Sequence, residues 1–351
     1  MNQLELTLDV SDAAGLGQPA AIAATVTLPD PDRMPNPPVV CFGKPGGGYS
    51  RGYYTESLPG PGIGAQAEWH ARRGWVFVSV DHLGVGASST DHDPTRLDYT
   101  TLAAAAQCAE EQVLARLREG SLRPDFPPIL DPIRLGIGQS MGGCMTVVQQ
   151  GRYHCYDGIG MLGFSAIHTH PPVRPGEAPL VTPWLPRDRL LQEPLTVLNV
   201  TQMEEIERRL VVDNEIQDQG LSMAWGFHYD DVDASLIEAD LIGFPHRNGN
   251  LPPWGSATQP LAVALSCATP GAVAPEAAAV RSPVLIALGE RDVCADPRGE
   301  PRAYLSAASV DLFVCPRMGH MHNFASTRQL LWQRIETWAA WVAAVKQAQQ
   351  A

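Results

Sequence analysis

The sequence feature that most constrains this chain is the pentapeptide GQSMG at residues 138–142, which separates two apolar runs. Residues 133–137 precede it and are typical of a short buried strand, and residues 143–148 follow it and are typical of a helix. A direct turn from strand to helix leaves no room for bulky neighbours, which explains the glycine on each side of Ser140. We therefore expect a strained nucleophile elbow at Ser140, with its hydroxyl clear of the sheet and the N-terminus of the helix behind it.

Further apolar runs predict strands that alternate with helices along most of the chain. Residues 4–10 and 21–28 are typical of an opening antiparallel hairpin. Apolar residues recur at spacings of three and four over residues 102–117, which indicates an amphipathic helix that ends at Gly120. Short buried strands are predicted at residues 39–42, 75–80, 133–137, 159–164, 284–288 and 310–314, and a closing helix at residues 331–345. This order predicts an α/β fold with a mostly parallel central sheet covered by helices on both faces.

The alternation breaks between residues 167 and 262, where proline is frequent and only short helical stretches such as 201–212 are expected. This segment would leave the sheet at the carboxyl end of the strand predicted at 159–164, which we count as the fifth of the parallel region. Open α/β sheets bind ligands at that edge. We therefore expect a core domain formed by residues 1–166 and 263–351, and a cap formed by residues 167–262 over the active site.

Composition and charge narrow the classes of partner. The formal net charge is −13, so a nucleic-acid backbone or an anionic membrane surface would be repelled. We see no basic and apolar leader at the N-terminus and no run of about 18 apolar residues that could span a bilayer. The seven cysteines are scattered and odd in number, which is typical of reduced thiols. We expect a cytoplasmic protein that acts on a small-molecule substrate, and the sequence leaves open whether it is a monomer or a homodimer.

A serine hydroxyl becomes an effective nucleophile only when a base accepts its proton and an acid orients that base. The loop GERD, after the strand predicted at 284–288, ends in Asp292, which is the candidate acid. Glu290 lies so close to the end of the strand that we do not expect it to reach the base. Asp296 lies about a turn too far along the chain.

The candidate base comes from the loop after the strand predicted at 310–314, which contains two histidines, His320 and His322. His322 lies beside Asn323, where the next helix is about to start, so we expect its ring to contact backbone or to line the substrate pocket. Both side chains point the same way if the loop is extended, so spacing alone does not separate the two histidines.

Taken together, these motifs resemble those of the α/β-hydrolase superfamily. The matching stretches are GQSMG at 138–142, DHLGVGAS at 81–88, GERD at 289–292 and GH at 319–320. The resemblance covers the core on both sides of the expected cap, and it implies the α/β-hydrolase fold with the order serine, acid, histidine along the chain. It also implies Ser140 as the nucleophile, Asp292 as the acid and His320 as the base, since the family's catalytic histidine commonly follows a glycine.

An oxyanion hole requires backbone N–H groups directed at the developing negative charge. Met141, which follows the nucleophile, is expected to supply one of them. The other would come from the loop PGGGY at residues 45–49, whose glycines let the backbone approach the substrate. This loop resembles the His-Gly-Gly-Gly loop of lipases and esterases, with Pro45 in the place of histidine, and it leaves Gly46 and Gly47 as alternatives.

No cofactor or metal site is predicted. Gly43-Lys44 lacks the upstream glycine of a phosphate-binding loop, and Met141 stands where a dinucleotide fingerprint needs its third glycine. The two H-x-H pairs, at 168–170 and 320–322, are not joined by a cluster of carboxylates in the sequence. The side chains expected to contact the substrate are Tyr49, Gln139, His168, Trp184, Trp225, Trp254 and His322.

These features predict a serine hydrolase of the carboxylesterase or lactonase type that acts on a small, largely apolar substrate through an acyl-enzyme. The aromatic residues of the expected cap favour an apolar substrate, and we expect the cap to control specificity more than the chemistry. Amidase, thioesterase and carbon–carbon hydrolase activities use the same three residues and stay as alternatives. A ligand-binding protein without enzymatic activity is the alternative from another class.

Overall fold

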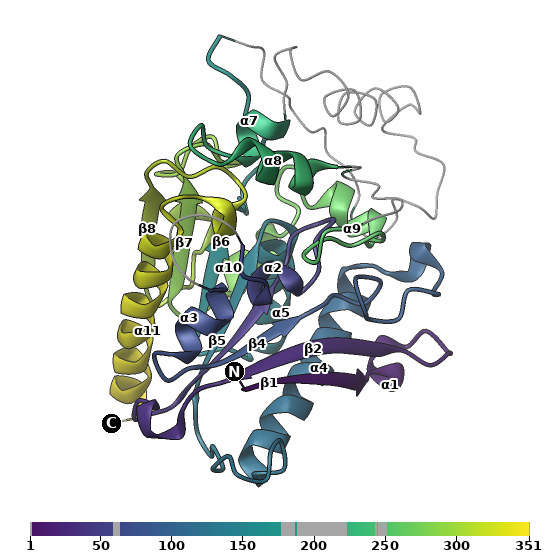
Figure 1. Ribbon diagram of the computed structural model, residues 1–351, viewed down its shortest axis with the longest axis vertical. Helices are drawn as coiled ribbons and strands as arrows, with labels where there is room; N and C mark the ends of the chain where they lie inside the picture. The colour runs from purple at the N-terminus through teal and green to yellow at the C-terminus, as the bar shows by residue number, and fades with distance from the viewer. Residues whose placement is uncertain are drawn as a thin grey trace.

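The computed structural model describes residues 2–58, 64–176, 187, 223–242, 244 and 251–350. These residues form an eight-stranded sheet in the order β1-β2-β4-β3-β5-β6-β7-β8, with helices on both faces (Figure 1). The strands are β1 (Asn2–Asp9), β2 (Ala21–Leu28), β3 (Val39–Lys44), β4 (Val76–Val80), β5 (Ile133–Gln139), β6 (Gly158–Leu162), β7 (Val284–Gly289) and β8 (Val310–Cys315). β2 pairs antiparallel with both β1 and β4, and all the other pairs are parallel.

This sheet confirms the predicted α/β class, the mostly parallel order and the opening hairpin. Each strand predicted from an apolar run is present, with ends that differ by a few residues. One detail of the prediction is wrong. β6 is the fourth strand of the parallel part in chain order, not the fifth, because β1 and β2 both lie in the antiparallel part.

Helices pack on the faces of the sheet and beyond its carboxyl edge. They are α1 (Ser11–Ala14), α2 (Gly52–Thr55), α3 (Gln66–Ala71), α4 (Tyr99–Glu119), α5 (Met141–Tyr153), α7 (Met223–Phe227), α8 (Ala234–Leu241), α9 (Leu261–Ser266), α10 (Ala274–Ala279) and α11 (Arg328–Gln350). The predicted helix at 102–117 is confirmed as α4. Asp98 caps its start by accepting the Thr101 N–H (2.8 Å), and Gly120 ends it with φ = 67°.

Side chains at alternate positions of the central strands separate two hydrophobic cores. On β3, Val40 and Phe42 belong to the core that α4 and α5 cover, whereas Val39 and Cys41 belong to the core that α11 covers. Successive side chains of a strand point to opposite faces, so a strand buried on both faces is apolar at nearly every position. This is why the strands were visible as continuous apolar runs.

Figure 1 shows α7 and α8 beyond the carboxyl edge of the sheet. Both belong to residues 167–262, which we call the inserted segment and which we expect to form a cap. The expected end of this segment falls inside α9, so a helix crosses that boundary. The helical stretch expected at 201–212 lies outside the described residues.

The seven cysteines are free thiols, and six of them are buried. Burial raises the pKa of Cys155 and of Cys267 to about 12, so these thiols are protonated at neutral pH. Among the helices in the described part of the chain, none is long and apolar enough to cross a membrane.

Candidate active site

Ser140 lies in the turn between β5 and α5 and is half-buried. Its backbone has φ = 54° and ψ = −121°, angles that a residue other than glycine rarely adopts, so the expected strain is present. Two hydrogen bonds hold the turn. The Ser140 N–H donates to the carbonyl of Leu162 at the end of β6 (2.8 Å), and the Ser140 carbonyl accepts from the N–H of Cys144 in α5 (3.1 Å).

The two glycines of the elbow are required by close backbone contacts. A Cβ atom built on Gly138 would lie 2.1 Å from the carbonyl oxygen of Gly142. A Cβ atom built on Gly142 would lie 2.2 Å from the carbonyl oxygen of Lys44, at the end of β3. Both distances are far below van der Waals contact, so neither position accepts a side chain unless the backbone moves.

Asp292 lies in the loop after β7, and its buried carboxylate accepts four hydrogen bonds. Oδ1 accepts from Nδ1 of His320 (2.7 Å) and from the N–H of Val293 (2.8 Å). Oδ2 accepts from Nε2 of His322 (2.7 Å) and from the N–H of Gly289 (2.7 Å). Burial alone would raise the pKa of Asp292, but the electrostatic interaction with His322 and the hydrogen bonds from both histidines outweigh it. The pKa of Asp292 is therefore below its ordinary value, and the carboxylate is ionised at neutral pH.

The two alternative carboxylates have other partners. Glu290 accepts the backbone N–H of Arg317 (2.8 Å), and Asp296 pairs with Arg302 (3.2 Å). Neither carboxylate contacts a histidine among the described residues. The geometry therefore favours Asp292 as the acid.

His320 belongs to the base loop, residues 316–324, and directs its second ring nitrogen toward the elbow. Its Nδ1 donates to Asp292, and its Nε2 lies 3.4 Å from Nε2 of Gln139, the residue before Ser140. The Gln139 amide also donates to the backbone carbonyl of His320 (3.0 Å). We expected Gln139 to contact the substrate. The structure places it in a completely buried position, where its amide joins the base loop to the elbow.

His322 is 1% exposed and lies against Asp292. Its Nε2 donates to the carboxylate, and its Nδ1 is buried with no hydrogen-bond partner among the described residues. We expected this ring to contact backbone or to line the substrate pocket. The structure places it at the start of a short 3-10 helix, η4 (His322–Phe324), with its polar contact to Asp292.

The oxyanion loop, residues 45–49, lies against the elbow. A Cβ atom built on Gly46 would lie 3.1 Å from Cβ of Ser140, and one built on Gly47 would lie 3.9 Å from Sδ of Met141. The absence of side chains therefore lets this loop approach the nucleophile. Both glycines are close enough to the elbow that either stays a candidate for the second N–H donor.

His82, in the loop after β4, holds the start of the oxyanion loop. Its Nε2 donates to the carbonyl of Pro45 (3.0 Å), and its ring is 4% exposed. Burial lowers the pKa of His82 to about 4, so the ring is neutral at pH 7. The resemblance drew attention to residues 81–88, but it did not predict this contact.

A second buried carboxylate, Asp240 on α8, joins the inserted segment to the oxyanion loop. It accepts hydrogen bonds from the Tyr49 hydroxyl (2.8 Å), from Nε2 of His228 (2.9 Å) and from Nε1 of Trp254 (2.8 Å). Tyr49 is 1% exposed and Trp254 is 8% exposed. Both were expected to contact the substrate, but their buried polar atoms bind Asp240 instead.

The other expected substrate contacts are dispersed. Trp225 on α7 is half-buried and packs on Arg291, whose guanidinium carbon lies 4.5 Å from the ring centroid. His168 packs on His170, with ring centroids 3.8 Å apart. Within the residues that the structure describes, no group of three or more histidine, cysteine, aspartate or glutamate side chains could hold a metal ion. Trp184 lies outside the described residues.

The contacts between α7 and the base loop were not predicted from the sequence. The backbone N–H groups of His320 and Met321 donate to the carbonyls of Gly226 and Phe227, both at 2.9 Å. A Cβ atom built on Gly319 would lie 2.5 Å from the Phe227 carbonyl oxygen, so this glycine permits the close approach of α7. The Phe227 ring lies 5.2 Å from the His320 ring.

Gly163, directly after β6, is another residue that the sequence analysis missed. It has φ = 60°, and a Cβ atom built on it would lie 3.1 Å from Nδ1 of His320 and 3.2 Å from Oδ1 of Asp292. A larger residue would therefore press on the hydrogen bond between these two side chains. The available signal was a glycine at the end of a predicted strand, where the chain turns at the carboxyl edge.

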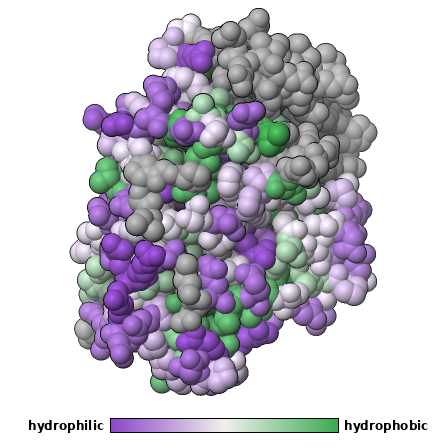
Figure 2. Space-filling view, viewed as in Figure 1, coloured by the Kyte–Doolittle hydropathy of each residue, from purple (hydrophilic) through white to green (hydrophobic). Residues whose placement is uncertain are grey.

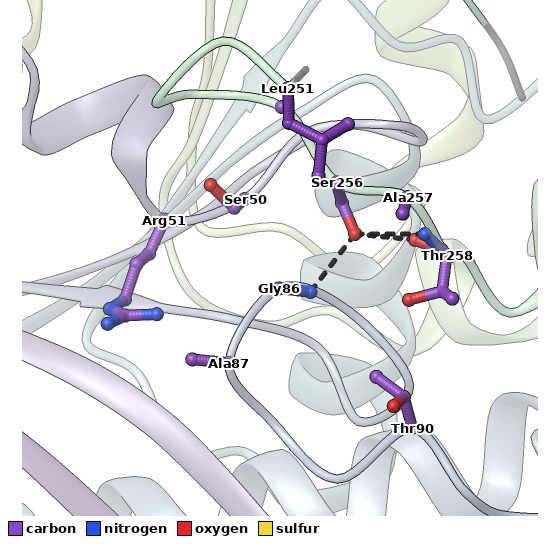
Figure 3. A pocket seen from close by; sticks show the side chains of 10 residues that line it. Ser50, Arg51, Gly86, Ala87, Thr90, Leu251, Ser256, Ala257 and Thr258 are labelled. Carbon is purple, nitrogen blue, oxygen red and sulfur yellow. Dashed lines mark hydrogen bonds between the residues drawn. The ribbon is translucent and has the colours of Figure 1, made fainter. Parts of the chain in front are cut away.

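A cavity of about 350 Å³ lies beside Ser50, the residue after the oxyanion loop (Figure 3). Its lining residues are Ser50, Arg51, Gly86, Ala87, Thr90, Leu251, Gly255, Ser256, Ala257 and Thr258. Arg51 in its wall is already paired with Asp81 (2.5 Å) and with Glu5 (2.8 Å). None of the predicted site residues lines this cavity, so it is separate from the candidate active site.

No protein-family model matches the sequence, and a search of curated proteins finds no significant match. Solved structures do resemble the chain. A proline iminopeptidase from Mycobacterium smegmatis is 14% identical, with a TM-score of 0.60 over 98% of this chain and 100% of that one. A thermophilic esterase from Thermogutta terrifontis is 14% identical, with a TM-score of 0.56 over 97% and 99% of the two chains. A peroxisomal alpha-beta-hydrolase from Saccharomyces cerevisiae is 15% identical, with a TM-score of 0.53 over 97% and 88%. Likeness at these identities establishes the fold alone.

Proposed function

We propose that this chain, which has the α/β-hydrolase fold, is a serine hydrolase that cleaves a carboxylic ester or lactone of a small, largely apolar substrate. The observation that carries the proposal is the series of contacts from strained Ser140 through Gln139 and His320 to buried Asp292. Acyl transfer to a serine needs a base with one free nitrogen and a carboxylate that holds the other nitrogen.

In the first half of the proposed reaction, Oγ of Ser140 attacks the carbonyl carbon of the substrate while Nε2 of His320 accepts the hydroxyl proton. Asp292 keeps the His320 ring in the tautomer with its proton on Nδ1, which leaves Nε2 free to act as the base. The same proton then passes from His320 to the leaving alkoxide. An ester releases an alcohol at this step, whereas the new hydroxyl of a lactone stays attached to the acyl group. The serine is left as an acyl ester.

In the second half, water attacks this ester with His320 again as the base, and the acid product leaves as Ser140 recovers its proton. The negative charge on the carbonyl oxygen in both halves would be stabilised by the N–H groups of Met141 and of Gly46 or Gly47. The N-terminus of α5, directly behind Ser140, adds a favourable electrostatic potential.

Aromatic side chains beside the base support an apolar substrate. Phe227 packs on the His320 ring, and Phe244 lies 5.4 Å from Phe227 and 5.9 Å from Tyr49 between ring centroids. Figure 2 shows hydrophobic residues at the surface around α8, where Ile242 is 58% exposed. In this proposal the inserted segment covers the site and presents apolar surface to the substrate.

The test is covalent labelling followed by steady-state kinetics. A fluorophosphonate should attach one label per chain, and Ser140→Ala should abolish both the label and the hydrolysis of p-nitrophenyl acetate. Ser306→Ala, at an exposed serine, is the matched control and should behave like the wild type. Labelling or turnover that survives in Ser140→Ala would refute the proposal.

A substrate panel then separates the bond types. Short and long acyl esters, lactones, thioesters and aryl amides should be ranked by kcat/KM, and we expect esters or lactones to rank first. An amide or thioester at the head of the ranking would keep Ser140 as the nucleophile and change the reaction class. Binding of these compounds without turnover by the wild type would favour the ligand-binding alternative.

A further inference from the structure

We propose that His322 is a positioning residue that holds the second oxygen of Asp292, so that the acid serves His320 through one oxygen only. This inference rests on the proposed function, in which Asp292 orients His320. It assigns a distinct task to each of two histidines that the sequence presents as alternatives. One is the base, and the other supports the acid.

The two carboxylate oxygens of Asp292 have the same kinds of donor, but the two histidines donate from different ring nitrogens. Each oxygen accepts one backbone N–H and one imidazole N–H. His320 donates from Nδ1, which leaves its Nε2 directed toward the elbow. His322 donates from Nε2, so its remaining nitrogen is Nδ1, on the opposite side of a ring that is 1% exposed. That nitrogen makes no hydrogen bond to the elbow or to any other described residue, so His322 is not placed to act as the base.

The partners of His322 also show which of its ring nitrogens serves Asp292. Its Nδ1 is buried with no hydrogen-bond partner among the described residues. The ring therefore makes its side-chain hydrogen bond through Nε2, to the carboxylate of Asp292. Tyr53, whose hydroxyl accepts the N–H of Asn323 (3.0 Å), is a further titratable group beside this loop, and burial raises its pKa so that it stays neutral.

An N–H donor at this position has two effects on Asp292. Together with the N–H of Gly289 it restrains Oδ2, which opposes rotation of the carboxylate and helps to keep Oδ1 in line with Nδ1 of His320. It also draws part of the negative charge toward Oδ2. Without this donor more of the charge would face His320, and the protonated form of His320 would be favoured.

The experiment compares His322→Gln with His322→Leu. The glutamine amide can place an N–H close to the position of the histidine Nε2, whereas leucine fills similar space without a donor. We expect His322→Leu to lower kcat by roughly tenfold to a hundredfold with little change in KM, and to move the acidic limb of the pH–rate profile to higher pH. His322→Gln should keep kcat within about threefold of the wild type and leave the acidic limb in place.

Three results would overturn the proposal. His322→Leu could retain full kcat, both variants could lose activity equally with an unchanged pH profile, or His322→Leu could lose fluorophosphonate labelling altogether, as a missing base would. Should His322→Leu fail to fold by circular dichroism, His322→Asn replaces it, because its amide is too short to reach Oδ2. Failure of the proposed function is recognised separately, since turnover would then persist in Ser140→Ala or be absent in the wild type.

Discussion

The two halves of the candidate active site are held by different kinds of contact. The nucleophile half consists of the elbow and the oxyanion loop, and it is built from neighbouring parallel strands through close backbone contacts at Gly138 and Gly142. The acid–base half consists of Asp292 and the base loop. It is held by side-chain hydrogen bonds and by α7, which comes from the inserted segment.

Residues 223–231, which consist of α7 and the turn after it, make several contacts with the acid–base half. Arg291, next to Asp292, is stacked between Trp225 and Tyr229, at 4.5 Å and 4.2 Å from their ring centroids, and it binds Asp230 (2.9 Å). In the base loop, Arg317 pairs with Asp231. Residues 223–231 therefore bridge the loop of the acid and the loop of the base.

This difference means that the inserted segment has two tasks. We expected it to control specificity more than chemistry, and its aromatic rings beside His320 agree with a role in specificity. Its backbone and its ion pairs, however, also contact the loops that carry Asp292 and His320, the candidate acid and base. A change in α7 should therefore alter kcat as well as the choice of substrate, whereas the nucleophile half should respond mainly to changes in the core.

The largest effect is expected at Asp292 itself. Asp292→Asn presents an amide to His320 and favours the wrong tautomer of the ring, so kcat should fall on the order of 10⁴-fold. Glu290→Gln is the matched control and should stay near the wild-type kcat. The measurement is the steady-state kcat of both variants. Near-full activity in Asp292→Asn, combined with a loss of activity in Glu290→Gln, would show that we chose the wrong carboxylate.

On the nucleophile side, we expect a pH effect on stability from His82. Its folded-state pKa of about 4 lies below the unfolded value of about 6.5, so protons bind the unfolded chain more readily. The free energy of unfolding should therefore fall as the pH is lowered from about 6.5 to about 4, by about 3 kcal/mol in total, and be constant with respect to this group above that range.

The measurement is urea unfolding at a series of pH values, for the wild type and for His82→Gln. Glutamine can still donate to the Pro45 carbonyl but does not titrate. The difference in the free energy of unfolding between the two proteins should become smaller as the pH falls. A difference that does not vary with pH would mean that His82 does not titrate as its burial indicates.

A smaller effect is expected on the acid–base side from Gly319→Ala. The added methyl group would lie 2.5 Å from the Phe227 carbonyl oxygen, so α7 and the base loop must separate by a fraction of an ångström or more. We expect kcat to fall roughly tenfold to a hundredfold because His320 moves, while the melting temperature changes little. Unchanged kinetics in a folded protein would show that the base loop does not depend on α7.

The smallest effect is expected from Trp225→Ala, which removes one face of the stack around Arg291. A cation–π contact contributes about 1 kcal/mol, so kcat should fall roughly fivefold or less. The loss should be similar for acetyl, butyryl and octanoyl esters, because the ring packs on Arg291. A changed ranking of kcat/KM among these esters would instead support the contact between Trp225 and the substrate that we expected from the sequence.

Much of the nucleophile half could be predicted because its conformation depends mainly on residues that are close together in the sequence. The GQSMG pentapeptide, the strand before it and the helix after it are contiguous, and steric exclusion in a tight turn depends only on those residues and the adjacent strand. The strands themselves were visible because a sheet buried on both faces requires apolar residues at successive positions. Asp292 and His320 were placed by their positions after strands, since parallel strands bring their carboxyl ends to one edge.

The partners of polar side chains were harder to predict. Tyr49 and Trp254 were expected to contact the substrate, but both bind Asp240, which lies 191 residues from Tyr49 and 14 from Trp254 along the chain. His322 was expected to contact backbone or to line the pocket, and the structure shows its ring bound to Asp292. An aromatic or imidazole side chain with a polar atom suits either a pocket or a buried hydrogen bond, so residue type alone does not distinguish the two.

The sequence by itself therefore determined the α/β class, the strained serine and the order of the three candidate catalytic residues, because these follow from backbone sterics and from hydrophobic periodicity over short distances. Only the tertiary structure decided which carboxylate oxygen meets which histidine and that α7 supports the base loop. These contacts join residues that lie 28 and 30 positions apart at Asp292, and about 90 positions apart between α7 and the base loop. Such pairings depend on how whole segments pack. The two histidines of the base loop differ in which ring nitrogen binds Asp292, Nδ1 in His320 and Nε2 in His322.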